Sequence, residues 1–402
     1  MVRFLHTSDW QLGMTRHYLA PRPGAEDDAQ ARFTADRIEA VRRIGRIARE
    51  EHCSFVVVAG DVFETQNVSK RVVALACEAM ASIGLPVLLL PGNHDSLEPR
   101  CIWDQDLFTD RCPSNVTVLR GTEPVDVADG VQVVGAPLTS RHPSSDPIAP
   151  AIADIKPDGT TRILVGHGQL PGLSGQDSEE AEIDATAIQE AVTSGAIGYA
   201  ALGDRHIRWP EDPHAAIRYC GTHETTRFTD PGRGSVDVVE VSGGEVTATP
   251  HEVGRWLHAR VSREMATDED IDAMAAELSG FDDPTRTIVR YDLHGHLSVA
   301  QNARLEALLA DRQEIFASLE PSAYRHDLVV TPDDGDLDGM DLPGWAASAA
   351  AELSEAAASS PTAIDALGLL RRLAMASPPG RAETPAVGEA HSGEAHSGEA
   401  HR

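Results

Sequence analysis

The sequence predicts an α/β protein in which two stacked sheets form a sandwich flanked by helices, followed by a smaller α+β domain. Three observations support this prediction. Apolar, β-branched runs alternate with amphipathic segments up to Leu90, short strands with close connections follow, and strand–helix alternation restarts near Trp256. Runs that are apolar throughout are typical of strands buried on both faces, and strand–helix alternation is typical of a parallel sheet covered by helices.

The N-terminal part predicts the order strand, helix, strand, helix, strand. Its first apolar run ends in a polar turn, as a buried strand does, and the next segment spaces isoleucine and valine at helical intervals with charges between them. The expected strands are Val2–Thr7, Phe55–Ala59 and Pro86–Leu90, and the expected helices are Arg32–Glu51 and Ser69–Ile83.

Short strands with few helices between them come next, and they predict a second sheet stacked on the first. The polar, acidic segment Pro171–Asp184 predicts a surface loop that leaves a strand end. The expected strands are Val116–Leu119, Val125–Val127, Val131–Gly135, Arg162–Gly166, Tyr199–Leu202, Ile217–Tyr219, Val236–Val241 and Val246–Thr249.

We place the end of the first domain at Glu252–Trp256, which gives a domain of residues 1–250 and a small α+β accessory domain of residues 256–376. Residues 378–402 end in tandem GEAHS repeats without large apolar side chains, so they are expected to be a disordered tail. Within the small domain we expect strands at Trp256–Val261, Thr287–Leu293 and Asp327–Val330 and helices at Thr267–Leu278 (capped by Thr267 and Asp270), Ser298–Ala310, Trp345–Ala358 and Ala363–Ala376.

Composition limits the function classes. The 402 residues include 34 Lys and Arg against 63 Asp and Glu, a formal net charge of −29. An acidic surface repels nucleic acid, so a DNA substrate would have to be captured locally by metals or by a partner. Five widely spaced cysteines without a C-x-x-C pair predict free thiols in a reducing compartment. With neither a signal-peptide run nor a membrane-length apolar run, we expect a cytoplasmic protein without a membrane contact.

Side chains that bind metals follow several of the expected strands, often beside a glycine. Because ligand sites form at the carboxyl ends of strands in open α/β sheets, these side chains should meet on one rim. A single Gly-Asp or Gly-His pair is weak evidence, whereas the ordered series is specific. The series comprises Asp9, Asp61, Asn93 with His94 and Asp95, His167, and Asp204 with His206.

This series resembles the calcineurin-like metallophosphoesterases and, within them, the SbcD-type DNA repair exonucleases. The resemblance covers residues 1–250, with a weaker echo in the small domain, and implies a metallophosphoesterase sandwich followed by a capping domain that shapes a DNA groove. The similar stretches are His6–Gly13, Val56–Glu64, Leu88–Asp95, Val133–Pro137, Leu164–Gly168, Tyr199–His206 and Tyr219–Phe228.

The resemblance implies two divalent metal ions that share Asp61. Two such ions clamp a phosphate and activate a water for in-line attack. His94 would stabilise the transition state or protonate the leaving oxygen, and Asp95 would either orient His94 or cap the turn. The remaining implied ligands are Asp9 and His206 for the first ion and Asn93, His167 and Asp204 for the second.

Two positions depart from the family pattern, since Gln11 and Asp204 stand where the family usually has histidine. The Gln11 amide oxygen is a weaker ligand than imidazole, and Asp204 adds a third carboxylate. Oxygen-rich sites favour Mn²⁺ over zinc, with Mg²⁺ or Fe²⁺ as alternatives. We therefore expect two manganese ions, the first of them labile.

The resemblance implies a metal-dependent DNA exonuclease acting in repair, with an SbcC-type coiled-coil ATPase as partner; we leave a homodimer open. A small-molecule phosphoesterase, acting on cyclic nucleotides or nucleotides, would share the motifs, although the chain beyond residue 250 weighs against it. The third alternative is a catalytically weakened interaction subunit, which the changes at Gln11 and Asp204 motivate.

Overall fold

The computed structural model of the protein describes residues 1–21, 28–173, 182–331, 344–357, 360, 362–363, 366 and 370. The chain divides into two units, one of Met1–Gly295 with Arg304–Asp327 and the other of His296–Ala303 with Leu328–Arg402. The predicted tail at residues 378–402 and most of the predicted helix at 363–376 lie outside the described residues.

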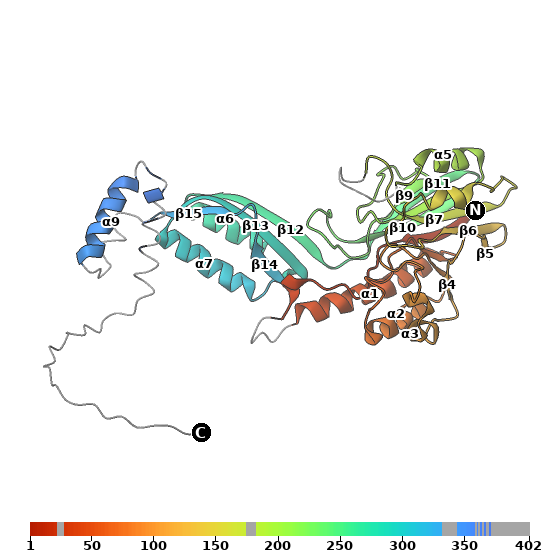
Figure 1. The fold of residues 1–402 in the computed structure, drawn as a ribbon, viewed down its shortest axis with the longest axis horizontal. Helices are drawn as coiled ribbons and strands as arrows, with labels where there is room; N and C mark the ends of the chain where they lie inside the picture. The colour runs from red at the N-terminus through yellow and green to blue at the C-terminus, as the bar shows by residue number, and fades with distance from the viewer. Residues whose placement is uncertain are drawn as a thin grey trace, which may run out of the picture. The chain divides into compact units, whose positions relative to one another are not determined.

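The first sheet has the strand order β11-β10-β1-β2-β3-β4, and Figure 1 labels β4, β10 and β11 among its strands. Strands β1 to β4 run parallel, whereas β10 is antiparallel to β1 and β11 to β10. The parallel part confirms the strand–helix alternation predicted from the sequence. The bounds are β1 Val2–Thr7, β2 Val56–Val58, β3 Val87–Leu89, β4 Val116–Val118, β10 Ser235–Ser242 and β11 Glu245–Glu252.

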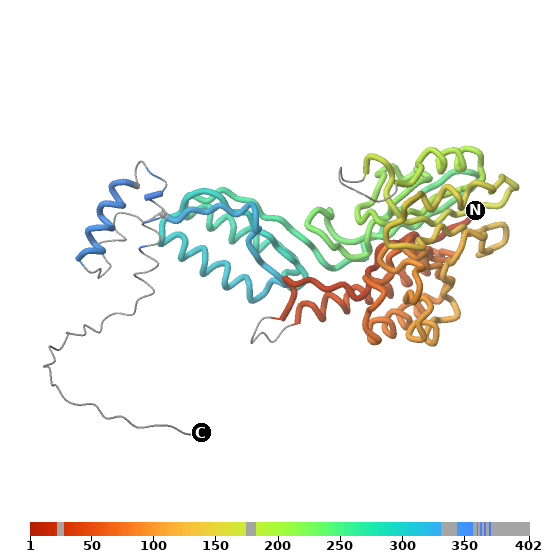
Figure 2. Tube along the Cα trace, in the orientation of Figure 1, coloured from red at the N-terminus to blue at the C-terminus, as the bar shows by residue number. Residues whose placement is uncertain are grey.

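The second sheet has the order β5-β6-β7-β8-β9 and is parallel except for β5. A buried core that includes Phe4 and Val57 of the first sheet and Ile163 and Tyr199 of the second joins the two sheets face to face. Figure 2 shows the two layers as neighbouring traces. The predicted two-sheet sandwich is confirmed. The bounds are β5 Val125–Ala128, β6 Val131–Ala136, β7 Thr161–His167, β8 Tyr199–Gly203 and β9 Ile217–Tyr219.

Helices cover both outer faces of the sandwich. Apolar residues of α1, α2 and α3 share a core with the first sheet, and those of α4 and α5 share one with the second. Neither α4 nor α5 was expected from the sequence. Helix α5 buries only Ile188, so its apolar periodicity is weak. The bounds are α1 Ala29–Glu50, α2 Lys70–Ile83, α3 Asp106–Thr109, α4 Ile148–Ile152 and α5 Ala185–Ser194, with 3₁₀ turns η1 His17–Leu19, η2 Ile102–Asp104 and η3 Pro284–Arg286.

A smaller parallel sheet follows, in which β13 pairs with β12 on one side and β14 on the other. Helix α6 starts with the predicted cap, because Thr267 and Asp270 bond reciprocally in a capping box. Strand β14 was not expected, since its four residues include a charge and a proline. The bounds are β12 Leu257–Met265, α6 Asp268–Ser279, β13 Thr287–Ser298, α7 Val299–Gln313, β14 Ser318–Pro321, β15 Asp327–Thr331 and α9 Gly344–Ala357.

The segment predicted as a domain boundary is partly buried, at Val253, Gly254 and Trp256, and it is bonded to the large domain. Trp256 is fully buried and its indole N–H donates to Asp36 of α1 at 3.1 Å. Arg286 also pairs with Asp36 at 2.6 Å. The carboxylate of Glu224 accepts from the backbone N–H of Arg255 and of Trp256. The division into residues 1–250 and 256–376 stays a prediction.

Two further expectations concern the cysteines and the membrane. All five cysteines carry free thiols, and four of them are buried, as the absence of a paired spacing predicted. Among the described residues, every helix is too short or too polar to cross a membrane.

Candidate metal centre

The predicted metal ligands meet at the carboxyl ends of strands from both large sheets. Asp9 follows β1 and Asp61 follows β2, while His167 ends β7. One ligand atom from each of these three side chains lies within 4.8 Å of the others, and all three residues are buried. The structure therefore contains a candidate metal site where the sequence placed one.

The remaining candidates surround these three. His167 Nε2 lies 3.5 Å from Asp61 Oδ1 and 3.8 Å from Asp204 Oδ1. His206 Nε2 lies 3.8 Å from Asp9 Oδ1, and the backbone N–H of Asp204 donates to the same carboxylate at 3.1 Å. Asp61 and Asp204 thus both lie near His167, while His206 lies beside Asp9.

Two side-chain oxygens in this cluster lack a hydrogen-bond donor. The Asn93 side-chain amide lies 3.0 Å from His167 Nε2 and faces the Asp61 carboxylate, and its hydrogen bonds are satisfied when the NH₂ group donates to both. Gln11 Oε1 and Asp204 Oδ2 are buried without a hydrogen-bond partner among the described residues. A buried acceptor without a donor is costly, and a cation supplies what these oxygens lack. The residues present therefore fit divalent ions; whether Gln11 itself is a ligand stays a prediction.

The backbone is strained at four of the candidate ligands. Their φ angles are 54° at Asp9, 41° at Gln11, 54° at Asp61 and 89° at Asp204. Non-glycine residues in this left-handed region cost about 1–3 kcal/mol each and cluster at functional sites. The strain aims each side chain back towards the rim from the end of its strand.

Buried polar groups hold the first strained loop in place. The guanidinium of Arg37, on α1, donates to the carbonyl of Trp10 at 2.7 Å. Thr222 Oγ donates to the carbonyl of Asp9 at 2.9 Å, and Ser8 Oγ donates to the Asp9 carboxylate at 2.7 Å. The sequence pattern did not single out Arg37 as part of the site. Its signal was a charged residue on the buried stripe of a helix, four positions before Val41.

Close packing at Gly92 brings the loop after β3 against Asp61. A Cβ atom at Gly92 would overlap the Asp61 carboxylate. A side chain there would push the loop away, and with it Asn93 and His94.

Burial and mutual repulsion shape the charges. Burial raises the pKa of Asp9 to about 7, and the nearby Asp61 carboxylate adds to the shift. Burial lowers the pKa of His167, but the carboxylates of Asp61, Asp9 and Asp204 outweigh it and raise the value to about 9. Without a cation the cluster therefore holds protons that a bound metal would displace.

Two histidines have their ring orientation set by backbone carbonyls. His167 Nδ1 lies 2.8 Å from the carbonyl of Ala59, so this nitrogen donates and Nε2 faces the cluster, where a bound metal would displace the second ring proton and take its lone pair. His94 Nδ1 lies 2.7 Å from the carbonyl of Glu64, and its Nε2 lies 3.8 Å from Asp61 Oδ2. The His94 side chain is 24% exposed, so it borders the cluster on the solvent side.

Asp95 does not have the orienting role that we considered for it. Its two carboxylate oxygens accept from the backbone N–H groups of Gly92 at 2.7 Å and Phe63 at 3.0 Å. The side chain closes the turn that carries Asn93 and His94, which was the other role left open. Nδ1 of His94 faces the Glu64 carbonyl and not Asp95. The prediction that Asp95 orients His94 is therefore wrong.

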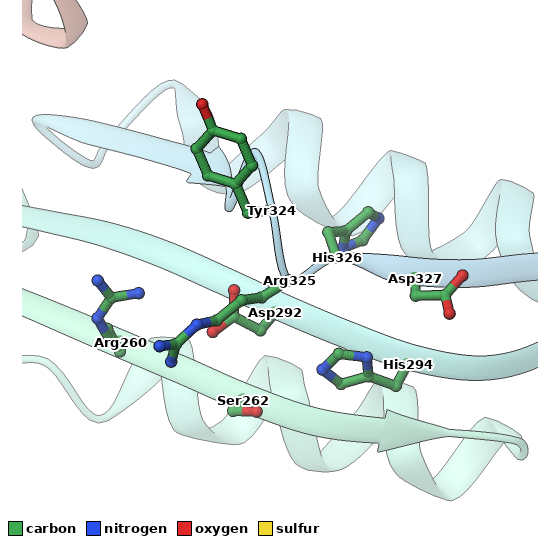
Figure 3. A pocket seen from close by; sticks show the side chains of 8 residues that line it. All are labelled: Arg260, Ser262, Asp292, His294, Tyr324, Arg325, His326 and Asp327. Atoms are coloured by element: carbon green, nitrogen blue, oxygen red, sulfur yellow. The ribbon is translucent and has the colours of Figure 1, made fainter.

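A second concave region lies on the small sheet and shares no residue with the metal cluster (Figure 3). It encloses about 500 Å³, and its lining mixes both charge signs. The Asp292 carboxylate there is buried, and its Oδ1 has no partner among the described residues. The lining residues are Arg260, Ser262, Asp292, His294, Tyr324, Arg325, His326 and Asp327.

A two-sheet sandwich with carboxylates and histidines converging at its strand ends defines a candidate metal-dependent protein of the α/β class. The sequence profile of the calcineurin-like phosphoesterases matches residues 2–207, just over half of the 402 residues. The chain belongs to this family, whose name describes hydrolysis of phosphate esters, and the resemblance seen in the sequence is confirmed.

Two curated relatives come from Bacillus subtilis strain 168. The D subunit of the nuclease SbcCD is 24% identical over 260 residues, which cover 63% of this chain and 51% of the relative. The uncharacterized metallophosphoesterase YhaO is 22% identical over 255 residues, which cover 61% of this chain and 59% of the relative. The chain thus spans between half and three-fifths of the length of these relatives.

Two solved structures are also similar. The protein TT1561 of Thermus thermophilus aligns with a TM-score of 0.37 at 11% identity, covering 63% of this chain and 99% of that one. A dimetal phosphatase from Danio rerio aligns with a TM-score of 0.35 at 12% identity, covering 62% and 98%.

Proposed function

We propose that this protein is a two-metal phosphodiester hydrolase, and specifically a DNA exonuclease of the SbcD type that acts in repair. The observation that carries the proposal is the convergence of acceptor atoms without matching donors at the strand ends. Asp9, Asp61 and His167 form its buried centre. The partly exposed His94 stands beside it, where a substrate would arrive.

The geometry supports a division of the ligands into two sets. Asp61 would be shared by both, because its carboxylate lies within 4.8 Å of ligand atoms of both Asp9 and His167. Asp9 and His206 would hold one ion, with Gln11 as a weak third ligand. Asn93, His167 and Asp204 would hold the other. Two bound divalent ions would supply Lewis-acid activation of the phosphate and of the attacking water.

His94 is the residue that we expect to act on the leaving group. Its Nδ1 is held by the Glu64 carbonyl, which leaves Nε2 to face the substrate side of Asp61. A histidine in that position can donate a proton to the departing oxygen and stabilise the charge on the phosphate.

We infer manganese as the preferred metal. The predicted oxygen ligands are the carboxylates of Asp9, Asp61 and Asp204 and the side-chain amides of Asn93 and Gln11. The predicted nitrogen ligands are two imidazoles. A set this rich in oxygen favours Mn²⁺ over zinc. Mg²⁺ and Fe²⁺ remain alternatives.

DNA as substrate is supported by the similarity to a protein named as part of a nuclease. The net charge of −29 disfavours nucleic-acid binding by the chain alone. We therefore propose that an SbcC-type ATPase partner supplies DNA affinity, in the cytoplasm, with a homodimer as a further expectation.

The test incubates the purified protein and Mn²⁺, with and without an SbcC-type ATPase partner, with linear DNA and, separately, with a cyclic nucleotide. We expect cleavage of DNA, and a His94→Ala variant prepared in parallel should lose it. Cleavage of the cyclic nucleotide alone would replace the proposal with a small-molecule phosphoesterase. Equal DNA cleavage by the variant would point to a contaminating nuclease and a dead site, and no cleavage by the unaltered protein with its ATPase partner present would favour a weakened interaction subunit.

A further inference from the structure

A chain of buried polar contacts leads away from His206 on the side opposite the cluster. His206 Nδ1 lies 2.5 Å from Thr226 Oγ, and Thr226 Oγ lies 3.3 Å from Asp230 Oδ2. The side chain of His206 is 6% exposed, while Thr226 and Asp230 are 3% and 7% exposed. Water does not compete for these contacts, so the three groups have to satisfy one another.

The Asp230 carboxylate also fixes the backbone that carries the threonine. Its Oδ2 accepts from the backbone N–H of Thr226 at 2.8 Å and from that of Arg227 at 2.9 Å. On the other side of the peptide, Arg16 donates to the carbonyl of Thr226 at 3.2 Å. The hydroxyl is therefore held rigidly in front of the imidazole.

The direction of the hydrogen bonds follows from counting protons. Nε2 of His206 faces Asp9 at 3.8 Å, and as a metal ligand it needs a free lone pair there. The ring proton then sits on Nδ1 and is donated to Thr226 Oγ. A hydroxyl that accepts this bond has one proton of its own, which it donates to the carboxylate of Asp230.

We propose that Thr226 and Asp230 are positioning residues that hold His206 in the Nδ1–H form and aim Nε2 at the metal. The proposal rests on the proposed function, because it takes His206 as a ligand. Metal-bound histidines commonly donate their other N–H to a carboxylate or carbonyl, and losing such a partner costs about 10–100-fold in metal affinity. Here the Thr226 hydroxyl lies between the His206 ring and the Asp230 carboxylate, so Asp230 acts on the orientation of His206 through that hydroxyl.

The neighbouring threonine provides a matched control. Thr225 is 2% exposed, and its Oγ lies 3.0 Å from Nδ1 of another buried histidine, His258. It also donates to the carbonyl of Trp256 at 3.1 Å. The two adjacent threonines thus make the same type of contact with a histidine, but only Thr226 contacts one of the rim histidines. Thr225→Val removes a comparable buried hydroxyl away from the cluster.

The experiment compares Thr226→Val, Thr225→Val, Thr226→Ser and Asp230→Asn with the unaltered protein. Mn²⁺ titration followed by calorimetry should give about 10–100-fold weaker binding for Thr226→Val and an affinity close to that of the unaltered protein for Thr225→Val and Thr226→Ser. Asp230→Asn keeps an oxygen for the backbone N–H groups but loses the charge, so we expect a smaller loss. Circular dichroism checks that each variant is folded.

A second measurement reports on the proton itself. In metal-free protein labelled with ¹⁵N at histidine, the ring nitrogens of His206 should show a proton on Nδ1, and this form should decline in Thr226→Val. Unchanged Mn²⁺ affinity in Thr226→Val, or a proton on Nε2 in the unaltered protein, would overturn the proposal. If the unaltered protein binds no Mn²⁺, the proposed function fails, and the tautomer measurement still decides the positioning role.

Discussion

The metal cluster and the pocket of the small sheet are both lined by charged and histidine side chains, yet they differ in backbone and in balance. The cluster sits on strained loops at strand ends, where φ reaches 89° at Asp204, and it buries Gln11 Oε1 and Asp204 Oδ2 without a donor among the described residues. The pocket is lined by residues of β12 and β13 and by residues 324–327, and its lining includes Arg260 and Arg325 as well as Asp292 and Asp327 (Figure 3). A mixed lining can neutralise itself, whereas a set of acceptors needs a cation. Buried acceptor oxygens that lack hydrogen-bond donors and lie on strained loops therefore indicate metal binding more strongly than a pocket that contains both charge signs.

The largest effect should come from Asp61, which faces both sets of ligands. Asp61→Ala is expected to lower hydrolysis of a chromogenic phosphodiester by about 10³-fold, the upper end of what losing one preorganised electrostatic group costs. Asp292→Ala in the pocket should leave that rate unchanged. Equal losses in the two variants would break the distinction between cluster and pocket.

His94→Ala should lower the same rate by about 10²-fold, because it removes a proton donor and leaves the ligands in place. The backbone N–H of His94 donates to Asp61 at 3.0 Å, and this bond survives the substitution. Mn²⁺ affinity measured by calorimetry should therefore stay the same. A parallel fall in affinity would mean that His94 helps to hold the metal.

Metal replacement tests the departure at Gln11. Metal-stripped protein titrated with Mn²⁺ should regain phosphodiesterase activity, whereas zinc alone should not restore it fully. Gln11→His puts an imidazole in place of an amide oxygen and should tighten binding of the weaker ion by about tenfold, within the range over which ligand-shell changes alter affinity. Full activity from zinc with no response to manganese would contradict the assignment.

Acid should destabilise the sandwich through His6, which lies on β1 just before the cluster. Burial, helped by the charge of Arg218, lowers the pKa of His6 to about 3 from 6.5. Between these values the unfolded chain binds a proton that the folded protein does not, so stability is lost as pH falls below 6.5. Each such histidine contributes a loss of about 1.4 kcal/mol per pH unit. Urea unfolding at several pH values should show a shallower slope for His6→Leu; an identical slope would exclude this cause.

The smallest effect is expected at Asp292. Its Oδ1 is buried without a partner among the described residues. Asp292→Asn removes the charge while it keeps the shape, so the free energy of unfolding should rise by up to about 1 kcal/mol. Urea unfolding measures this change. A marked fall in stability would show that the carboxylate is paired in solution.

Much of the fold could be predicted because burial leaves a direct mark on the residues. The run of three valines predicted β2, and the spaced valine and isoleucine predicted α1. The predicted ends of both elements lie within a few residues of the observed ends. Helix α5 escaped prediction because it buries only Ile188, and β14 because it is a short strand that ends at a proline. Such short segments are held in place by contacts with neighbouring elements. Their sequences therefore show little hydrophobic periodicity from which to predict them.

For the site, the sequence by itself determined which residue types stand at the strand ends, and so the identity of Asp9, Asp61, Asn93, His167, Asp204 and His206 as candidates. Only the tertiary structure decided their relations. The strand ends of the two sheets lie close enough for Asp9, Asp61 and His167 to form one cluster. The Asp95 carboxylate accepts a backbone hydrogen bond and so stabilises the turn. The tertiary structure also placed Arg37 and Thr226 behind the ligands. The physical reason is that such contacts join residues far apart in the chain, where local pattern carries no information, and only packing of the two sheets sets their distances.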